Sequence, residues 1–266
     1  MLGTILLGLA LALSLLAMLL MGQAGRGRGG AVWGRRLADG AFGSVLLASA
    51  LLYWYIFQNH FDIAYVWSYS SRDLSWLYKI TVFWAGQEGS FLFWLLVHAA
   101  AGCVLCRKGR MKGAALAVYL LLQSLLVVLL LDKSPFAPMT ESYGDGMGLN
   151  PLLQDPWMAI HPPIIFIGYA LLAVPYAYAA GALLMRGGTD WIRPARRWGF
   201  LAWGFLGAGI FIGGYWAYKV LGWGGYWGWD PVENSSLVPW LVTAASLHLL
   251  GLVRRMRGRV VGGGEF

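Results

Sequence analysis

The chain has 266 residues, of which 59% are hydrophobic and only 12% are charged, and its mean hydropathy is +0.61. A soluble domain of this length cannot bury so large an apolar fraction, so the composition excludes an ordinary soluble protein and indicates an all-α, polytopic membrane bundle. The formal net charge of +8 requires no nucleic-acid partner, because membrane topology explains where the basic residues lie.

Seven segments have the length and apolar character of a membrane-spanning helix. We expect these spans at about residues 4–21, 41–58, 82–105, 114–131, 163–185, 199–218 and 232–253, within one membrane domain that covers 1–266. The first segment follows Met1 without a basic leader or a small-residue cleavage site. We therefore expect it to be retained as a span rather than removed as a signal peptide.

The basic residues gather on one side of the predicted bundle. Of 20 Lys and Arg residues, 16 fall in the stretches 26–36, 107–112, 186–197 and 254–259, which follow spans one, three, five and seven. The other four lie in the opposite loops: Arg72, Lys79, Lys133 and Lys219. Because Lys and Arg accumulate on the cytoplasmic side, we expect the N-terminus and the longer loops to lie outside.

The third outer loop has an unusual density of aromatic residues. Trp223, Tyr226, Trp227 and Trp229 fall within seven positions and are separated mainly by glycines. Aromatic residues that only mark the membrane interface do not need this density. Glycine lets a backbone approach a ligand closely, and indole rings offer flat apolar faces. Residues 219–236 therefore predict an outer platform for a flat, apolar ligand.

The residues after this loop predict the start of the last span. In the stretch D-P-V-E, Asp230 suits the N-cap, Pro231 the first helical position and Glu233 the third. Both carboxylates would then stabilise the positive end of the helix dipole. A functional role toward a ligand also stays open for both acids. The two roles are compatible, because the cap would hold the tryptophans in place.

Two histidines lie inside predicted spans, where an ionisable side chain is a functional candidate. At 1.5 Å per residue, His248 in span seven lies roughly 9 Å from the inner boundary, and His98 in span three roughly 13 Å. Two imidazoles at similar depth on different helices can ligate one haem iron from opposite faces. The alternative for each is a neutral histidine that is hydrogen-bonded to a neighbouring helix.

The other two histidines border spans on the outer side. His161 stands in "AIHPPIIF", where Pro162 predicts an extended conformation for it just outside span five. A histidine fixed in this way is either a metal ligand or an ordinary interface residue. His60 follows span two without a comparable constraint, and we interpret it as an interface residue.

Span three carries two further features. Glu88 is expected six residues inside it, where desolvation disfavours the charged carboxylate, and it can bind a cation, relay a proton or bond the next helix. Cys103 and Cys106 form a C-x-x-C at the inner end, but no histidine follows as it would at a c-type haem site. We interpret both cysteines as small packing residues.

Three segments together carry a family resemblance. "GWGGYWGWDPVENSSLVPWL" resembles the tryptophan-rich WWD signature of the haem-handling proteins of cytochrome c biogenesis. "YVWSYSSRDLSWLYKITVFWAGQEGSFLFW" and "NPLLQDPWMAIHPPIIFIGYA" are similar to the CcmF branch rather than to the shorter CcmC. The segments occur in the family's order and extend from about residue 64 to 241.

The resemblance implies a component of a haem lyase in the bacterial inner membrane, with its functional loops on the periplasmic face. In the family, the WWD loop holds haem between two flanking histidines, of which the first matches His161. A structural haem b lies in the membrane, and one of its ligands matches His248. The resemblance thus implies haem b as cofactor and haem as transferred substrate, with Trp223, Tyr226, Trp227, Trp229 and Asp230 on the outer side.

The resemblance also implies partners and a reaction. The family receives haem from the chaperone CcmE, acts with CcmH-type thiol oxidoreductases, and attaches haem to apocytochrome c by thioether bonds between its vinyl groups and the cysteines of C-x-x-C-H. Members of the CcmF branch are much longer, and their second histidines lie in the later part. We expect those ligands beyond this chain or on a separate chain, and we interpret residues 260–266 as a linker or cloning remnant.

Two other classes of protein stay open at this point. A transporter or exporter of haem would show broken helices near the midplane, for which Pro175 and Pro239 are the candidates. A structural membrane subunit would bind no haem at all.

Overall fold

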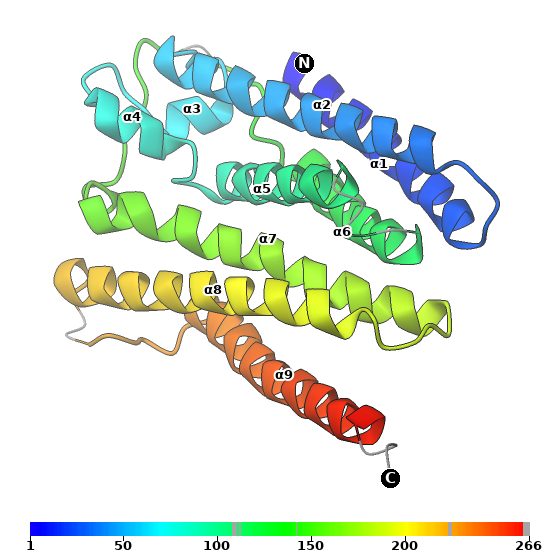
Figure 1. Ribbon diagram of the computed structural model, residues 1–266. Helices are drawn as coiled ribbons and strands as arrows, with labels where there is room; N and C mark the ends of the chain where they lie inside the picture. Colours follow the sequence, from blue (N-terminus) through cyan, green and yellow to red (C-terminus); the bar gives the residue numbers. More distant parts are fainter. Residues whose placement is uncertain (108–110, 112, 142, 223–224, 263–266) are drawn as a thin grey trace.

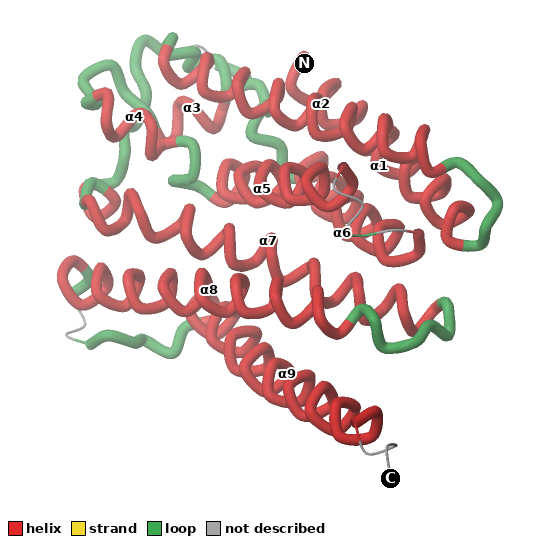
Figure 2. Tube along the Cα trace, in the orientation of Figure 1, coloured by secondary structure: helices red, strands yellow, loops and turns green. Residues whose placement is uncertain are grey.

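The structure is a computed structural model that describes residues 1–107, 111, 113–141, 143–222 and 225–262. Within these residues the secondary structure is helical apart from one isolated β-bridge between Ile63 and Pro138. Figure 1 and Figure 2 show long helices that run side by side, with the short helices and longest loops gathered at one end. The predicted all-α membrane bundle is therefore confirmed.

Seven helices are long and apolar enough to cross a membrane. They are α1 (Leu2–Gly25), α2 (Ala31–Phe57), α5 (Gln87–Arg107), α6 (Gly113–Asp132), α7 (Pro156–Leu184), α8 (Ile192–Val220) and α9 (Pro231–Gly262). Each corresponds to one predicted span, so the chain is a multi-pass membrane protein. The shorter elements are α3 (Ala64–Tyr69), α4 (Trp76–Val82) and the 3-10 turn η1 (Pro151–Leu153).

Several helices start at positions different from the predicted ones. Helix α2 begins at residue 31 instead of 41, and α8 at 192 instead of 199. Hydropathy detects only the apolar part of a helix, whereas the backbone stays helical until a residue ends it. For α2 this residue is Gly30, which adopts a left-handed conformation with φ 87°. At the C-terminal end, α9 continues through Gly262, so residues 260–262 of the predicted linker are helical and 263–266 lie outside the described residues.

The transmembrane helices pack in two groups that meet along α7. Helices α1, α2, α5 and α6 contact one another, while α8 lies along the length of α7 and α9 packs on α8 (Figure 1). In α1 the buried residues recur every three or four positions, and they define one narrow face: Gly3, Leu7, Ala10, Ser14, Ala17 and Met21. Small residues let membrane helices approach closely on this face, whereas the apolar side chains on the other faces of α1 stay exposed, as expected of a surface that contacts lipid.

Buried polar residues add hydrogen bonds between and beside these helices. The amide of Gln123 on α6 donates to the hydroxyl of Ser14 on α1 at 2.9 Å, and both side chains are buried. At the loop end, the hydroxyl of Tyr65 on α3 bonds the carbonyl of Val82 at 2.8 Å and accepts the backbone N–H of Gly86. Tyr65 thereby fixes the turn that separates α4 from α5.

The loops fall at two opposite ends of the bundle. Residues 26–30 and 186–191, both in predicted basic stretches, lie at one end, and α3, α4 and the start of α7 lie at the other (Figure 1). This grouping agrees with the arrangement predicted from the Lys and Arg positions. Helices α7 and α9 continue through Pro175 and Pro239 without a break. The described residues at these positions therefore lack the broken helices expected of a transporter.

Candidate functional site

A small cavity at the loop end brings His161 together with the tryptophan-rich loop. The outer cavity, of about 130 Å³, lies between α7, α8 and the start of α9. Its lining includes His161 from α7, Gly213 and Gly214 from α8, Trp227 from the loop, and Asp230 at the start of α9. These residues lie up to 69 positions apart, and only the packing of three helix ends places them around one space.

His161 lies inside α7 rather than in an extended segment before it. The helix starts at Pro156, with Asp155 as its N-cap, and continues through Pro162 and Pro163. The prediction of an extended His161 outside span five was therefore wrong. A proline only disfavours a helical conformation for the preceding residue, and a membrane helix tolerates the missing N–H groups when neighbouring helices support it.

The imidazole of His161 has a fixed orientation against α8. Its Nδ1 lies 2.8 Å from the backbone carbonyl oxygen of Gly209. Because a carbonyl only accepts, Nδ1 carries the hydrogen and Nε2 keeps a free lone pair. The ring lies on Gly213, where a Cβ atom would come within 2.5 Å of Cε1. A bond from one ring nitrogen to a carbonyl is the usual support for a histidine whose other nitrogen binds a metal.

The glycines of α8 allow close contacts with two neighbouring helices, α7 and α9. Gly209 and Gly213 face α7, since a Cβ at Gly209 would lie 2.8 Å from that of Ile165. Gly207 faces α9, where a Cβ would lie 2.8 Å from Nε1 of Trp240. Sequence reasoning missed these glycines. The i, i+4 spacing of Gly209 and Gly213 was the available signal, because small residues at that spacing mark a close helix contact.

An apolar cavity adjoins the outer cavity on the side of α9. This aromatic cavity, of about 480 Å³, is lined by Gly207, Ile210, Phe211, Gly214, Tyr226, Trp227, Leu237 and Trp240. It shares Ile210, Gly214 and Trp227 with the outer cavity, so the two spaces meet at the indole of Trp227. Phe211 and Trp240 were not predicted as site residues, because within apolar spans they cannot be distinguished from lipid-facing aromatics.

The other aromatic residues of the loop are more exposed. Trp229 is 72% exposed and meets Trp227 edge to face, with 6.4 Å between the ring centroids. Its φ of 58° shows a left-handed backbone, which is uncommon for a bulky residue. Tyr226 is 60% exposed and stacks on Tyr218 at 4.5 Å. Trp223 lies outside the described residues.

The predicted cap of the last span is confirmed. Helix α9 begins at Pro231, and the N–H of Glu233 donates to Oδ1 of Asp230 at 2.7 Å. The carboxylate of Glu233 in turn accepts the N–H of Gly228 at 2.7 Å. Both acids therefore hold the loop onto the helix start.

An ion pair fixes the start of α7 against the end of α8. Nζ of Lys219 lies 2.8 Å from Oδ2 of Asp155, and Oδ1 of Asp155 accepts the N–H of Trp157 at 2.8 Å. Burial by itself would raise the pKa of Asp155, but the ammonium and the N–H bonds outweigh it and hold that pKa below 3.8. Asp155 lies six residues before His161. Its ion pair with Lys219 therefore fixes the start of α7, the helix that carries His161.

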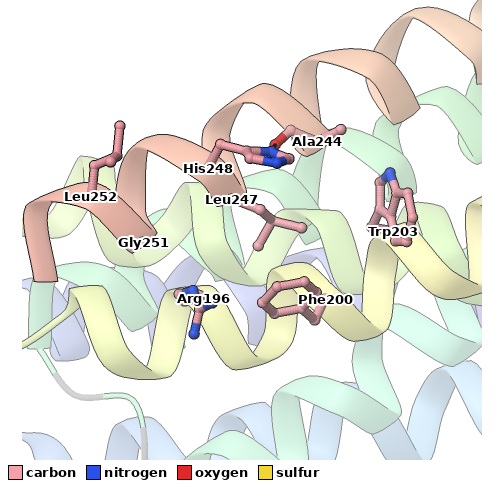
Figure 3. A pocket seen from close by; sticks show the side chains of 8 residues that line it. All are labelled: Arg196, Phe200, Trp203, Ala244, Leu247, His248, Gly251 and Leu252. Atoms are coloured by element: carbon pink, nitrogen blue, oxygen red, sulfur yellow. Dashed lines mark hydrogen bonds between the residues drawn. The ribbon is translucent and has the colours of Figure 1, made fainter. Parts of the chain in front are cut away.

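A second histidine lines a cavity at the other end of α8 and α9. The inner cavity, of about 510 Å³, has His248 on α9 opposite Phe200 and Trp203 on α8 (Figure 3). Nδ1 of His248 lies 2.8 Å from the carbonyl oxygen of Ala244, one turn earlier in the same helix. His248 thus has the same arrangement as His161, with Nδ1 engaged and Nε2 free.

His98 is not brought to this cavity. It is 1% exposed on α5, its ring stacks on that of Tyr119 of α6 at 4.0 Å, and its Nε2 lies 3.2 Å from the carbonyl oxygen of Tyr119. The hydroxyl of Tyr119 donates back to the carbonyl of His98 at 2.8 Å. The histidine and the tyrosine thus form a reciprocal contact between two helices.

Glu88 lies in the first turn of α5, not six residues inside the span as predicted. The difference arises because residues 76–82 form the separate helix α4, so the span starts only at Gln87. A carboxylate in the first turn of a helix is stabilised by the positive end of the helix dipole. The predicted position of Glu88 inside the span was therefore wrong, and its possible roles in binding a cation, relaying a proton or bonding the next helix stay predictions.

The two cysteines and His60 agree with their predicted roles as packing residues and as an interface residue. Cys103 and Cys106 are buried free thiols, and His60 packs against Trp54 and Tyr55. No group of three or more His, Cys, Asp or Glu residues gathers anywhere in the described part of the chain. Each histidine cavity therefore offers one imidazole rather than a closed metal centre.

Comparison with known proteins gives consistent results. A family model for "Cytochrome C assembly protein" matches residues 84–261. The chain is 41% identical over 215 residues to the cytochrome c-type biogenesis protein ccl1 of Rhodobacter capsulatus, covering 78% of this chain and 33% of that protein. It is 38% identical to CcmF of Pseudomonas aeruginosa, covering 96% of this chain and 40% of that protein.

A solved structure titled "Cytochrome c Heme Lyase CcmF" superposes with a TM-score of 0.80 at 35% identity, over 97% of this chain and 42% of that one. The chain thus spans about a third to two fifths of the length of the relatives that it matches. The matched segment, residues 84–261, contains both histidine cavities and the tryptophan-rich loop. The chain belongs to the cytochrome c assembly protein family.

Proposed function

We propose that this chain handles haem in cytochrome c maturation and presents it at the outer membrane face for covalent attachment to apocytochrome c. One observation carries the proposal: His161 keeps Nε2 free beside a tryptophan-lined apolar space. Haem b would then occupy the inner cavity. The transferred haem would occupy the outer cavity together with the adjoining aromatic cavity, and we call these two cavities the outer site.

The residues at the outer site fit a planar ligand with a central metal. The orientation of His161 is fixed by Gly209, so its Nε2 can ligate iron without a further search for a rotamer. Trp227 and Trp240 supply flat apolar walls, and Gly207 and Gly214 leave room beside them. We assign Asp230 and Glu233 to holding the loop, because both carboxylates are engaged at the start of α9.

The proposed chemistry is thioether formation, in which a cysteine S–H of the C-x-x-C-H motif adds across a haem vinyl group. The new C–S bond forms at one vinyl carbon and the proton of the thiol goes to the other. The addition therefore needs neither an oxidant nor a reductant. This chain's residues contribute positioning: they bind the porphyrin face and leave its edge accessible from outside. We assign no catalytic acid or base among them.

The inner cavity suits a second, membrane-embedded haem ligated by His248. Two protein ligands would hold each haem iron, and each cavity offers one imidazole. We propose that the second ligands come from the remaining part of a longer protein or from a second chain, consistent with the third to two fifths of the relatives' length that this chain covers. Haem supply by CcmE and cooperation with CcmH-type oxidoreductases belong to the same proposal.

The membrane orientation is part of the proposal. With the N-terminus outside, the loop end of the bundle faces the periplasm, where the apocytochrome would be matured. The Lys and Arg distribution supports this orientation.

The test measures haem by the pyridine haemochrome assay in the purified chain and in His161→Ala and His248→Ala variants. Each variant should lose the haem of one site, and the double variant should retain almost none. His60→Ala is the matched control, because His60 is engaged with Asp62 and Trp54 outside both cavities. If both single variants keep the full haem content of the parent, the proposed ligands are wrong.

A further inference from the structure

We infer that Arg196 is the residue that fixes the orientation of the ligand in the inner cavity. It would do so by binding a carboxylate at one edge of a planar, apolar tetrapyrrole, so that this edge points to the basic end of α8. The inference rests on the proposed function, because it takes His248 as the ligand of a haem iron in the same cavity.

The guanidinium of Arg196 is held in place while one of its N–H groups, Nε–H, has no hydrogen-bond partner among the described residues. Its carbon lies 4.8 Å from the centre of the Phe200 ring, and a Cβ at Gly251 of α9 would lie 3.8 Å from Nε. The Nε–H is shielded from solvent and has no hydrogen-bond partner among the described residues. A shielded donor without a partner costs free energy, and a bound acceptor would recover it.

Arg196 also lies at the junction of two cavities with different chemistry. On one side is the inner cavity, whose walls are apolar except for His248 and Arg196 itself. On the other is a basic cavity of about 650 Å³, which shares Arg196 and Phe200. The residues that line the basic cavity are Thr189, Asp190, Ile192, Arg193, Arg196, Arg197 and Phe200. Its three arginines outnumber the single carboxylate of Asp190.

A second unsatisfied group points to the same ligand chemistry. The hydroxyl of Thr189, in the basic cavity, is shielded from solvent and has no partner in the described part of the chain. The inner cavity and the basic cavity together form one groove. This groove offers an imidazole at its apolar end and unpaired donors at its basic end. A ligand that fits both ends has a metal in an apolar ring and anionic groups at one edge.

One ligand in the inner cavity can contact both His248 and Arg196, because both residues line that cavity. Gly251, which lies against the guanidinium, is one helical turn after His248, so both face the same side of α9 (Figure 3). Guanidinium groups bind carboxylates through two parallel N–H bonds, which fixes direction as well as affinity. The haem of the proposed function carries its two carboxylates at one edge and thus matches this arrangement.

The test compares haem with haem dimethyl ester, which keeps the iron and ring but has no free carboxylate. Both are titrated by visible absorbance into the detergent-solubilised His161→Ala chain, so that the inner cavity is measured without the outer site. We expect haem to bind on the order of tenfold more tightly than the ester, and R196Q to remove that preference. R196K should retain part of it, because lysine keeps the charge but not the two parallel bonds.

R36Q is the matched control, since Arg36 lies on α2 against Trp33, away from the groove, and carries the same charge. It should leave the preference for haem unchanged. If R196Q also leaves it unchanged, or if ester and haem bind equally to the parent, the inference about Arg196 is wrong. If neither compound binds more tightly to this chain than to a chain that also lacks His248, the proposed membrane haem site fails as well, which separates the two failures.

Discussion

Trp203 of α8 and Trp240 of α9 stack face to face, with 5.3 Å between ring centroids and 7° between ring planes. Nε1 of Trp240 also donates to the backbone carbonyl of Trp203 at 3.1 Å. Trp203 lines the inner cavity and Trp240 lines the aromatic cavity. The stacked pair therefore forms the wall between the two candidate sites. It is also a principal contact that holds α9, which otherwise has few helix partners.

We predict that Trp240→Ala weakens haem binding in both sites. The substitution removes the stack and the hydrogen bond, and an aromatic-to-alanine change at a packed position costs about 3 kcal/mol of stability. Trp240→Phe should keep most of the binding, because the ring remains. Haem titration and thermal unfolding in detergent measure both effects. Trp76→Ala is the control, since Trp76 is 70% exposed; an equal loss in that variant would contradict the prediction.

We predict that Gly213→Ala displaces His161. A Cβ at residue 213 would lie 2.5 Å from Cε1 of the imidazole, so the ring must move and lose its bond to Gly209. Haem binding at the outer site should fall on the order of tenfold or more, with inner-site binding retained. The control is Gly204→Ala on the same helix, where nothing lies within 4 Å of the new atom. That variant should be neutral or stabilised by about 0.5–1 kcal/mol.

We predict an acid-dependent loss of stability that depends on Asp155. Its pKa in the folded protein lies below 3.8, so the pair with Lys219 contributes stability that is present above that pH and is lost as the pH falls through the lower, folded value. Asp155→Asn keeps a side-chain oxygen for the N–H of Trp157 but removes the charge. The unfolding midpoint of the parent should fall more steeply than that of the variant below about pH 4. Parallel curves would show that the pair contributes nothing.

We predict that Asp230→Ala frays the start of α9 without removing the helix. The loss of the bond to the N–H of Glu233 should cost about 1 kcal/mol, whereas Asp230→Asn or Asp230→Ser should cost much less because both residues also cap helices. Hydrogen exchange of the backbone amides of residues 232–234 measures the effect directly. Asp73→Ala, in the first outer loop, is the control. Unchanged exchange in Asp230→Ala would mean that the cap does not stabilise this helix end.

The sequence determined the architecture because membrane helices leave a strong local signal. An apolar run of about 20 residues can satisfy its backbone hydrogen bonds in lipid only as a helix, so each of the seven spans was evident from composition. The cap formed by Asp230 and Glu233 is equally local, because its bonds join residues no more than five positions apart. The tryptophan-rich loop and the candidates His161 and His248 also followed from the sequence and from the family resemblance.

The tertiary structure decided which of these residues meet. His161 and Trp227 share a cavity only because α7, α8 and α9 end together, and the bond from His161 to Gly209 requires a helix contact that no local pattern specifies. The same packing gave His98 a partner in Tyr119 and put Arg196 beside Gly251 near His248. Local sequence encodes where a helix forms, but the side-chain fit between helices determines what each helix places in a site.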